Sequence, residues 1–302
     1  MDDDGAPLIR SRALAGQEAL MAKTTRPLDN QPNGAAIANE ARPVTVPDFL
    51  SARSRGVRLT VLTAYDYPMA RLLDAAGVDA LLVGDSLGMV VQGHEHSLSV
   101  TVEEMIYHTR MVARAAKHSL VIADMPFMSF QVSPEQAVSN AGRLVKEGGA
   151  HAVKIEGGVR SAASIAAIAR ADIPVMGHIG LTPQSVRRFG GFRVQRDANQ
   201  LLEDALATER AGAFGLVIEC VPAELAQQIT AAVTIPTIGI GAGAGCDGQV
   251  LVTYDMIGLF DDFHPRFVKQ YADIGRAILQ AAQAYCREVR EGSFPSEEHS
   301  FR

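Results

Sequence analysis

The sequence predicts a (β/α)₈ barrel, a TIM-barrel fold of the α/β class, and three observations support this prediction. Eight short apolar runs follow one another from residue 59 onward, helical segments with capping signals separate them, and glycine or polar residues end them. Near-continuous apolar runs are typical of strands buried on both faces. Because parallel strands need crossover connections, strands that alternate with helices indicate a parallel sheet. Eight such units favour a closed barrel over the alternative, an open doubly wound sheet.

The predicted strands are short and rich in β-branched residues. They span residues 59–64, 80–84, 120–123, 152–155, 174–177, 215–218, 237–240 and 250–253. An N-terminal helix is expected before the first strand, because Thr45 can cap it, Pro47 suits its first turn and Asp48 favours its positive end. A long helical extension is expected at the C-terminal side, over residues 267–290.

Capping signals mark the helices between the strands. Thr101 and Glu104 have the spacing of a capping box, in which each side chain accepts from the other residue's backbone N–H. Ser133 is expected to cap another helix, with Pro134 at its first position. Three glycines stand where helices should end: Gly77, Gly148 and Gly212.

Composition bounds the domain organisation and the partners. The 302 residues are 47% apolar and 21% charged, which suits a globular protein with one sizeable core. Residues 1–43 lack apolar periodicity, so we expect a mobile tail there and a single catalytic barrel domain over residues 44–302. The formal net charge of -6 argues against a nucleic-acid partner, which would require a basic surface.

Cysteine usage and hydropathy bear on the compartment. The three cysteines form no CxxC pair and no disulfide framework, so a reducing compartment is expected. No apolar segment follows the acidic start as in a signal peptide, and no apolar run approaches the ~18 residues of a membrane span. We therefore expect a cytoplasmic protein without a membrane partner.

Polar residues at the strand ends are the candidate site, because a barrel places its active site at the carboxyl ends of its strands. The residues found there are Asp85, Asp124, Lys154, Glu156, His178 and Glu219. A single aspartate after a strand is usually a turn or cap residue. Together, however, four carboxylates, an ammonium and an imidazole would converge on one mouth. Clustered carboxylates repel one another unless a cation or proton lies among them, and Mg²⁺ suits such oxygen ligands.

Several of these residues also have a structural interpretation. Lys154 and Glu156 point the same way along one strand, and by themselves they are as compatible with an interior ion pair as with a site. Charges in the inner layers are costly, so a functional pair at the mouth is favoured. An isolated His178 is more often a hydrogen-bonded core residue. The glycine-rich run 239–243 is interpreted as close backbone packing, with phosphate binding the weaker option. Cys220 has no evident base partner, so a buried thiol is favoured over a nucleophile.

The chain resembles the ketopantoate (3-methyl-2-oxobutanoate) hydroxymethyltransferase family from about residue 44 to its end. The matching segments, in order, are 63–66, 83–89, 123–127, 153–158, 177–185, 219–222, 239–243, 247–249 and 298–301. The resemblance implies a phosphoenolpyruvate mutase-like barrel and a homodecamer. It also implies a reaction of pantothenate biosynthesis: a hydroxymethyl group passes from the co-substrate 5,10-methylenetetrahydrofolate to 3-methyl-2-oxobutanoate, through a Mg²⁺-stabilised enolate, giving 2-dehydropantoate.

The same resemblance implies roles for individual residues. Asp85 and Asp124 would bind Mg²⁺ directly, with Glu156 nearby through water. Glu219 would be the general base. The residues implied to bind or position the oxo acid are Asp85, Ser86, Asp124, Lys154 and His178.

Two competing hypotheses remain open. One is another Mg²⁺–enolate barrel, a lyase or mutase of the phosphoenolpyruvate mutase and isocitrate lyase kind; many of these carry a Lys-Lys-Cys-Gly-His lid motif, which this sequence lacks. The other is a catalytically silent oligomer that binds oxo acids, which predicts the loss of a ligand or of Glu219.

Overall fold

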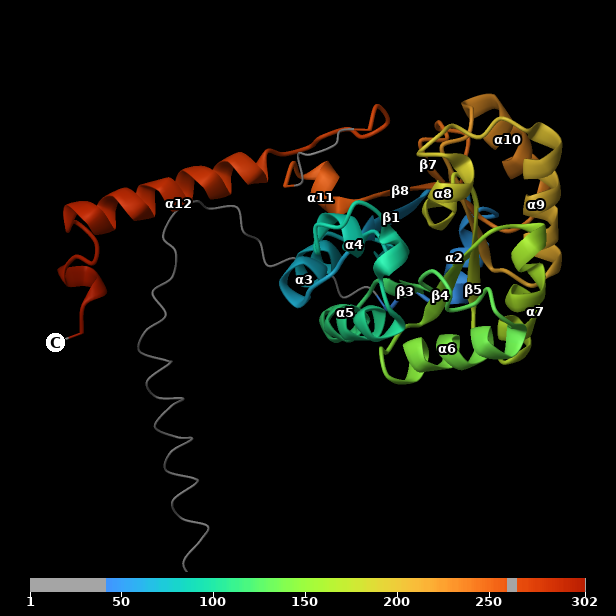
Figure 1. Cartoon of the computed structure of the whole chain (residues 1–302), viewed down its shortest axis with the longest axis horizontal. Coiled ribbons are helices and arrows are strands. Elements are labelled where there is room, and N and C mark those ends of the chain that lie inside the picture. The colour runs from blue at the N-terminus through green and yellow to red at the C-terminus, as the bar shows by residue number, and fades with distance from the viewer. Residues whose placement is uncertain (1–41, 260–264, 302) are drawn as a thin grey trace, which may run out of the picture. The chain divides into compact units, whose positions relative to one another are not determined.

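The computed structural model describes residues 42–259 and 265–301 and contains a closed barrel of eight parallel strands (Figure 1). Each strand pairs with the next along the chain, and β8 pairs with β1. The strands are β1 Leu59–Thr63, β2 Ala80–Val83, β3 Leu120–Asp124, β4 Ala152–Glu156, β5 Val175–Gly180, β6 Gly215–Glu219, β7 Thr237–Ile240 and β8 Gly248–Leu251. The barrel is confirmed, and the open sheet is wrong.

Most predicted strand bounds agree with the structure to within one residue. The exceptions are β5, which continues to Gly180, and β8, which begins at Gly248 instead of residue 250. The apolar pattern misses Gly248 because it has no side chain. A Cβ there would lie 2.4 Å from the carbonyl oxygen of Leu59, so glycine is what allows β8 to approach β1.

Figure 1 shows helices α3 to α10 around the barrel, in the connections that follow its strands. The helices of the described residues are α2 Val46–Ala52, α3 Tyr67–Ala75, α4 Leu87–Val90, α5 Val102–Ala115, α6 Pro134–Lys146, α7 Ala162–Arg170, α8 Val186–Phe189, α9 Ala198–Arg210, α10 Ala223–Ala232, α11 Thr253–Met256 and α12 Ile274–Glu291. Short 3₁₀ turns span Ser97–Ser99, Val159–Ser161, Pro183–Ser185 and Glu297–His299. The predicted capping box of Thr101 and Glu104 is present, and Ser133 caps α6.

Three expectations concern the ends of helices and the N-terminal tail. The C-terminal helix begins at Ile274, not at residue 267. Asp273 caps it, because its side chain accepts from the N–H of Arg276. After α6, Gly148 follows the C-cap residue Glu147 as expected, and its neighbour Gly149 has the left-handed backbone. Of the expected mobile tail, residues 1–41 lie outside the described residues. Within the described part of the chain, no helix combines the length and apolarity needed to cross a membrane.

The core has two layers because strand side chains alternate between the two faces of the sheet. Val153 and Ile155 belong to the outer layer, which packs against the helices. The inner layer fills the barrel and includes Leu59, Val61, Leu120, Ile122, Ala152, Met176, Val217, Ile238 and Val250. The inner layer occupies the part of the barrel toward the strand starts and leaves the other end for polar residues.

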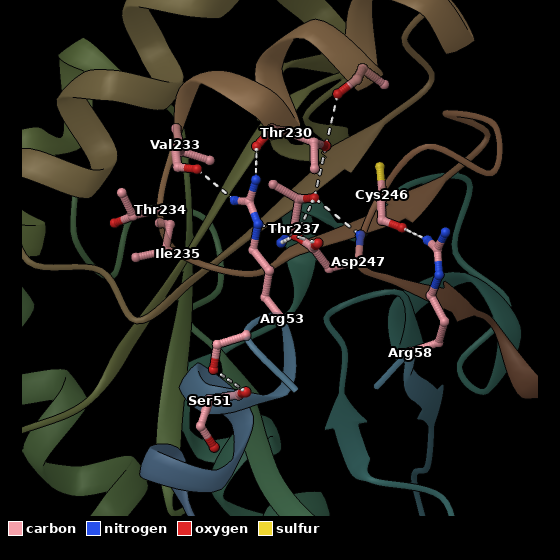
Figure 2. A network of polar contacts seen from close by, with 12 residues as sticks. Ser51, Arg53, Arg58, Thr230, Val233, Thr234, Ile235, Thr237, Cys246 and Asp247 are labelled. Atoms are coloured by element: carbon pink, nitrogen blue, oxygen red, sulfur yellow. Dashed lines mark hydrogen bonds and ion pairs between the residues drawn. The ribbon is translucent and has the colours of Figure 1, made fainter. Parts of the chain in front are cut away.

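Helix α2 closes the barrel at the end where the strands begin. Its Phe49 is fully buried in the inner layer and contacts Phe214 edge-to-face, with ring centroids 5.6 Å apart. Arg53, just after the helix, donates to the carbonyl oxygen of Thr230 in the last turn of α10 and to that of Val233 just after α10 (Figure 2). This closure explains why the cavity opens at the opposite end.

Candidate active site

Ionisable residues occupy inward-facing positions near the carboxyl ends of four neighbouring strands. Along β3 the inward row runs through Ile122 to Asp124, and along β4 it runs through Ala152 to Lys154 and Glu156. The same period of two carries β5 from Met176 to His178 and β6 from Val217 to Glu219. An alternation that buries apolar residues near the strand starts therefore delivers polar residues to the mouth.

All seven predicted site residues line one cavity of about 360 Å³ at the carboxyl ends of the strands. They are Asp85, Ser86, Asp124, Lys154, Glu156, His178 and Glu219. Asp85 and Ser86 come from the turn after β2, where a Cβ on Gly84 would lie 2.7 Å from the hydroxyl of Ser86. The glycine thus leaves room for the hydroxyl of Ser86. In the same turn the N–H of Asp85 donates to Oδ2 of Asp124 at 3.0 Å.

Lys154 is a buried cation at the centre of the site. Its Nζ lies 2.8 Å from Oδ1 of Asp124 and 3.1 Å from Nδ1 of His178, and the residue is only 4% exposed. Burial alone would lower the pKa of Lys154, but the carboxylates of Asp124, Glu156 and Asp85 raise it overall. The ammonium is therefore charged at neutral pH and is available to an anionic ligand.

The carboxyl groups around Lys154 outnumber it. Burial, followed by the charge of Asp124, raises the pKa of Asp85 to about 7. Burial, followed by the charge of Asp85, raises the pKa of Glu156 well above its ordinary value. These directions mean that the site holds more negative charge than one lysine offsets, so it attracts protons or a cation.

The donor set fits Mg²⁺ if the cation takes other ligands as well. Oε1 of Glu156 is buried and has no hydrogen-bond partner. Among the described residues, no group of three or more His, Cys, Asp or Glu side chains is arranged to hold a metal by itself. Mg²⁺ commonly takes one or two carboxylates and completes its shell with water and substrate oxygens. Asp85 and Asp124 can supply those two carboxylates.

His178 is neutral and faces Glu219. Burial and then the charge of Lys154 lower the pKa of His178 well below its ordinary value. An ammonium can only donate, so Nδ1 of the ring accepts from Lys154 and Nε2 carries the proton. Nε2 lies 3.1 Å from Oε2 of Glu219.

Glu219 has the properties of a proton acceptor near neutral pH. Its side chain is 16% exposed, whereas that of His178 is 3% exposed, so the carboxyl group borders the cavity. Burial raises the pKa of Glu219 to about 7. A carboxylate of that pKa is a stronger base than an ordinary glutamate and is still largely ionised at slightly alkaline pH.

Two buried residues contact the site without having been predicted as part of it. The hydroxyl of Tyr65 lies 2.9 Å from that of Ser86. The side chain of Gln184 donates to Oδ2 of Asp85 at 2.9 Å. Both lie in segments of the family resemblance, which is the sequence signal that includes them, although it does not predict their contacts. The outer part of the cavity adds Phe192, Arg193 and Phe267.

The remaining candidate residues follow the structural interpretation. Burial, followed by the charge of Glu219, raises the pKa of Cys220 to about 12, which disfavours a thiolate nucleophile. Gly241 packs against the ring of Phe267 and Gly243 against Ala223, so this run provides close backbone packing.

The fold and the site together define a class: an enzyme-like (β/α)₈ barrel that gathers carboxylates, one lysine and one neutral histidine at its strand ends. Solved structures of similar fold include 2,3-dimethylmalate lyase, a member of the PEP mutase/isocitrate lyase superfamily, with a TM-score of 0.55 and 18% identity over 85% of this chain and 91% of that chain. Phosphonopyruvate hydrolase in complex with oxalate and Mg²⁺ is similar too, with a TM-score of 0.55 and 14% identity over 84% of this chain and 93% of that one. At these identities the likeness concerns the fold.

Sequence comparison is more specific. The family model for ketopantoate hydroxymethyltransferase matches residues 43–297. The chain is 58% identical to the 3-methyl-2-oxobutanoate hydroxymethyltransferase of Pelobacter propionicus over 85% of this chain and 97% of the relative. It is 59% identical to the enzyme of that name from Clostridium novyi over 85% of this chain and 95% of the relative. The chain belongs to the ketopantoate hydroxymethyltransferase family.

Proposed function

We propose that this protein transfers a hydroxymethyl group from 5,10-methylenetetrahydrofolate to 3-methyl-2-oxobutanoate and so forms 2-dehydropantoate. The observation that carries the proposal is the 58% identity to a relative of that name over 85% of the chain. The lyase of similar fold shares only 18% identity, so the lyase or mutase alternative has no comparable support. The gathering of all seven expected residues in one cavity argues against a catalytically silent binder.

Asp85 and Asp124 are the residues we assign to Mg²⁺, with Glu156 acting through water. Their charge and burial support this assignment, as does the unpaired Oε1 of Glu156. Mg²⁺, when bound, supplies Lewis-acid polarisation of the 2-oxo group.

The chain's own residues then have distinct tasks. Lys154 pairs with the negative charge of the oxo acid and stabilises charge that grows as the C3 proton leaves. The hydroxyl of Ser86 binds the oxo acid beside Asp85. Glu219 removes the C3 proton, and the neutral His178, whose Nε2 lies 3.1 Å from Oε2 of Glu219, helps to position the substrate and that carboxylate. The nucleophilic carbon then attacks the one-carbon unit, whose chemistry belongs to the folate. In the complete reaction, the bonds from that unit to the folate nitrogens break, water supplies the hydroxyl, and tetrahydrofolate leaves.

A product assay tests the proposal. The protein is incubated with 3-methyl-2-oxobutanoate, methylenetetrahydrofolate and Mg²⁺, and 2-dehydropantoate is measured by mass spectrometry. Product should form only with both substrates and should fall when the metal is chelated. A protein that binds the metal and the oxo acid yet forms no product would contradict the proposal.

For assembly and location, we propose a homodecamer in the cytoplasm. The number ten follows from the family resemblance. Support for self-association comes from α12, where Ile278, Tyr285 and Val289 share one helix face and are each more than 40% exposed. Light scattering should give ten times the 32.2 kDa chain mass. A monomeric protein in that measurement would refute the assembly.

A further inference from the structure

Gln184 is a buried amide that bridges the parts of the proposed metal site. It lies in the 3₁₀ turn Pro183–Ser185 after β5 and is 7% exposed. Its side-chain nitrogen donates to Oδ2 of Asp85 at 2.9 Å and to the carbonyl oxygen of Met125 at 2.9 Å. Its backbone N–H donates to Oε2 of Glu156 at 3.0 Å.

The surroundings of Gln184 determine the orientation of its amide. Two acceptors lie at one end, and the side-chain nitrogen of Gln131 donates to the oxygen at the other end at 3.1 Å. An amide oxygen cannot donate, so the reversed orientation would place it against two acceptors. The group is therefore fixed as a donor toward Asp85.

A neutral donor suits this position on electrostatic grounds. It occupies one oxygen of each of two carboxylates, Asp85 and Glu156, while it adds no positive charge that would repel a divalent cation. The other oxygen of Glu156, Oε1, has no hydrogen-bond partner and stays available. A lysine or arginine in the same place would instead neutralise the carboxylates.

We propose that Gln184 is a positioning residue that orients Asp85 through its side chain and Glu156 through its backbone N–H for divalent-cation binding. This inference rests on the metal assignment in the proposed function. Groups that orient metal ligands from behind typically contribute ten- to a hundredfold to metal affinity or activity. Only the side-chain half of the contact changes on mutation, because any residue at 184 except proline keeps the N–H that reaches Glu156.

The test measures Mn²⁺ binding to the metal-free full-length protein, without substrate, by the electron paramagnetic resonance signal of free Mn²⁺. Gln184→Leu should weaken the affinity about tenfold or more, because it removes the donor at nearly constant volume. Gln131→Leu keeps the contact between Gln184 and Asp85, so it should weaken the Mn²⁺ affinity by no more than about threefold. Gln228→Leu, on the exposed face of α10, should leave the affinity unchanged.

Turnover adds a second readout. At saturating Mg²⁺ the kcat of Gln184→Leu should return to within about threefold of wild type, because the role lies in metal positioning. Unchanged Mn²⁺ affinity in Gln184→Leu, or equal losses in Gln184→Leu and Gln131→Leu, would overturn the proposal. If Gln184→Leu does not fold, Gln184→Asn decides in the same titration, since its shorter amide cannot bridge Asp85 and Met125.

The two proposals fail in distinguishable ways. A wild-type protein that binds Mn²⁺ but makes no 2-dehydropantoate would refute the proposed function and leave the Gln184 measurement valid. A wild-type protein that binds no Mn²⁺ would refute the Gln184 proposal directly.

Discussion

The two ends of the barrel contain polar networks of opposite character. At the closed end, Arg53 donates to the carbonyls of Val233 at 2.5 Å and Thr230 at 2.8 Å and lies 3.6 Å from Asp247, which in turn accepts from the N–H of Thr237 at 2.9 Å (Figure 2). At the mouth, by contrast, Glu156 has an unpaired buried oxygen.

The difference separates stability from function. Buried polar groups normally satisfy one another, and the closed end does so with neutral carbonyls, hydroxyls and one partly exposed ion pair. The mouth instead keeps carboxyl groups with raised pKa values close together, an arrangement that is costly without a ligand. Substitutions at the closed end should therefore change unfolding, whereas substitutions at the mouth should change turnover.

The largest expected effect is that of Glu219→Gln. The amide keeps the shape but cannot accept the C3 proton, so kcat should fall by about 10²- to 10⁴-fold while the melting temperature does not decrease. Deuterium exchange at C3 of 3-methyl-2-oxobutanoate, followed by NMR, measures the step directly. Exchange at the wild-type rate would show that Glu219 is not the base.

The opposite result is expected at the closed end for Arg53→Met. Loss of the guanidinium leaves the carbonyls of Thr230 and Val233 without this donor, which should lower the free energy of unfolding by about 2 kcal/mol. Turnover per folded molecule should not change. Urea unfolding gives the first quantity, and an activity assay without urea, well below the unfolding midpoint, gives the second.

A matched control sharpens the comparison. Arg55 is exposed and donates only within its own segment, to the carbonyl oxygens of Ser51 and Asp48. Arg55→Met should therefore change the free energy of unfolding by no more than about 0.5 kcal/mol. Equal losses for Arg53→Met and Arg55→Met would mean that the network at the closed end does not stabilise the barrel.

The same contrast explains what the sequence could predict. Strand alternation and capping residues are local signals, so all eight strands, the box at Thr101 and Glu104, and the cap at Ser133 were predictable. The start of β8 was missed because Gly248 has no apolar side chain to mark it. Glycine is required there by the close approach of β8 to β1, which the local sequence does not show.

The site was predictable to a similar degree. The sequence predicts that Asp124, Lys154, His178 and Glu219 lie together, because each is near the carboxyl end of a strand and shares the inward-facing side of the alternating pattern. The contacts of Tyr65 and Gln184 could not be predicted, because each depends on the fold of a turn that brings together residues 21 and 99 positions apart. The roles of the predicted ligands remain predictions.

The pH dependence of turnover tests the raised pKa of Glu219. A base must be ionised, and burial raises its pKa to about 7, so kcat should fall as the pH decreases below about 7, approaching tenfold per pH unit. An ordinary glutamate would stay ionised down to about pH 5. Saturating Mg²⁺ is required, because protons on Asp85 and Glu156 would otherwise compete with the cation. A kcat that stays flat to pH 5.5 under these conditions would contradict the assignment.

The smallest expected effect is that of Tyr65→Phe, which distinguishes a contact to a substrate-binding residue from a contact to the base. The ring of Tyr65 packs edge-to-face on Tyr254 with centroids 5.4 Å apart, and phenylalanine preserves that packing. The hydrogen bond to Ser86 is lost, which corresponds to about 1 kcal/mol, so the KM for the oxo acid should rise about fivefold with kcat nearly unchanged. Tyr254→Phe is the control, because its hydroxyl lies 3.4 Å from Asp66 and makes no contact with Ser86. A fall in kcat with constant KM would instead place Tyr65 in the proton-transfer step, and the mouth would then contain a second functional group outside the strand ends.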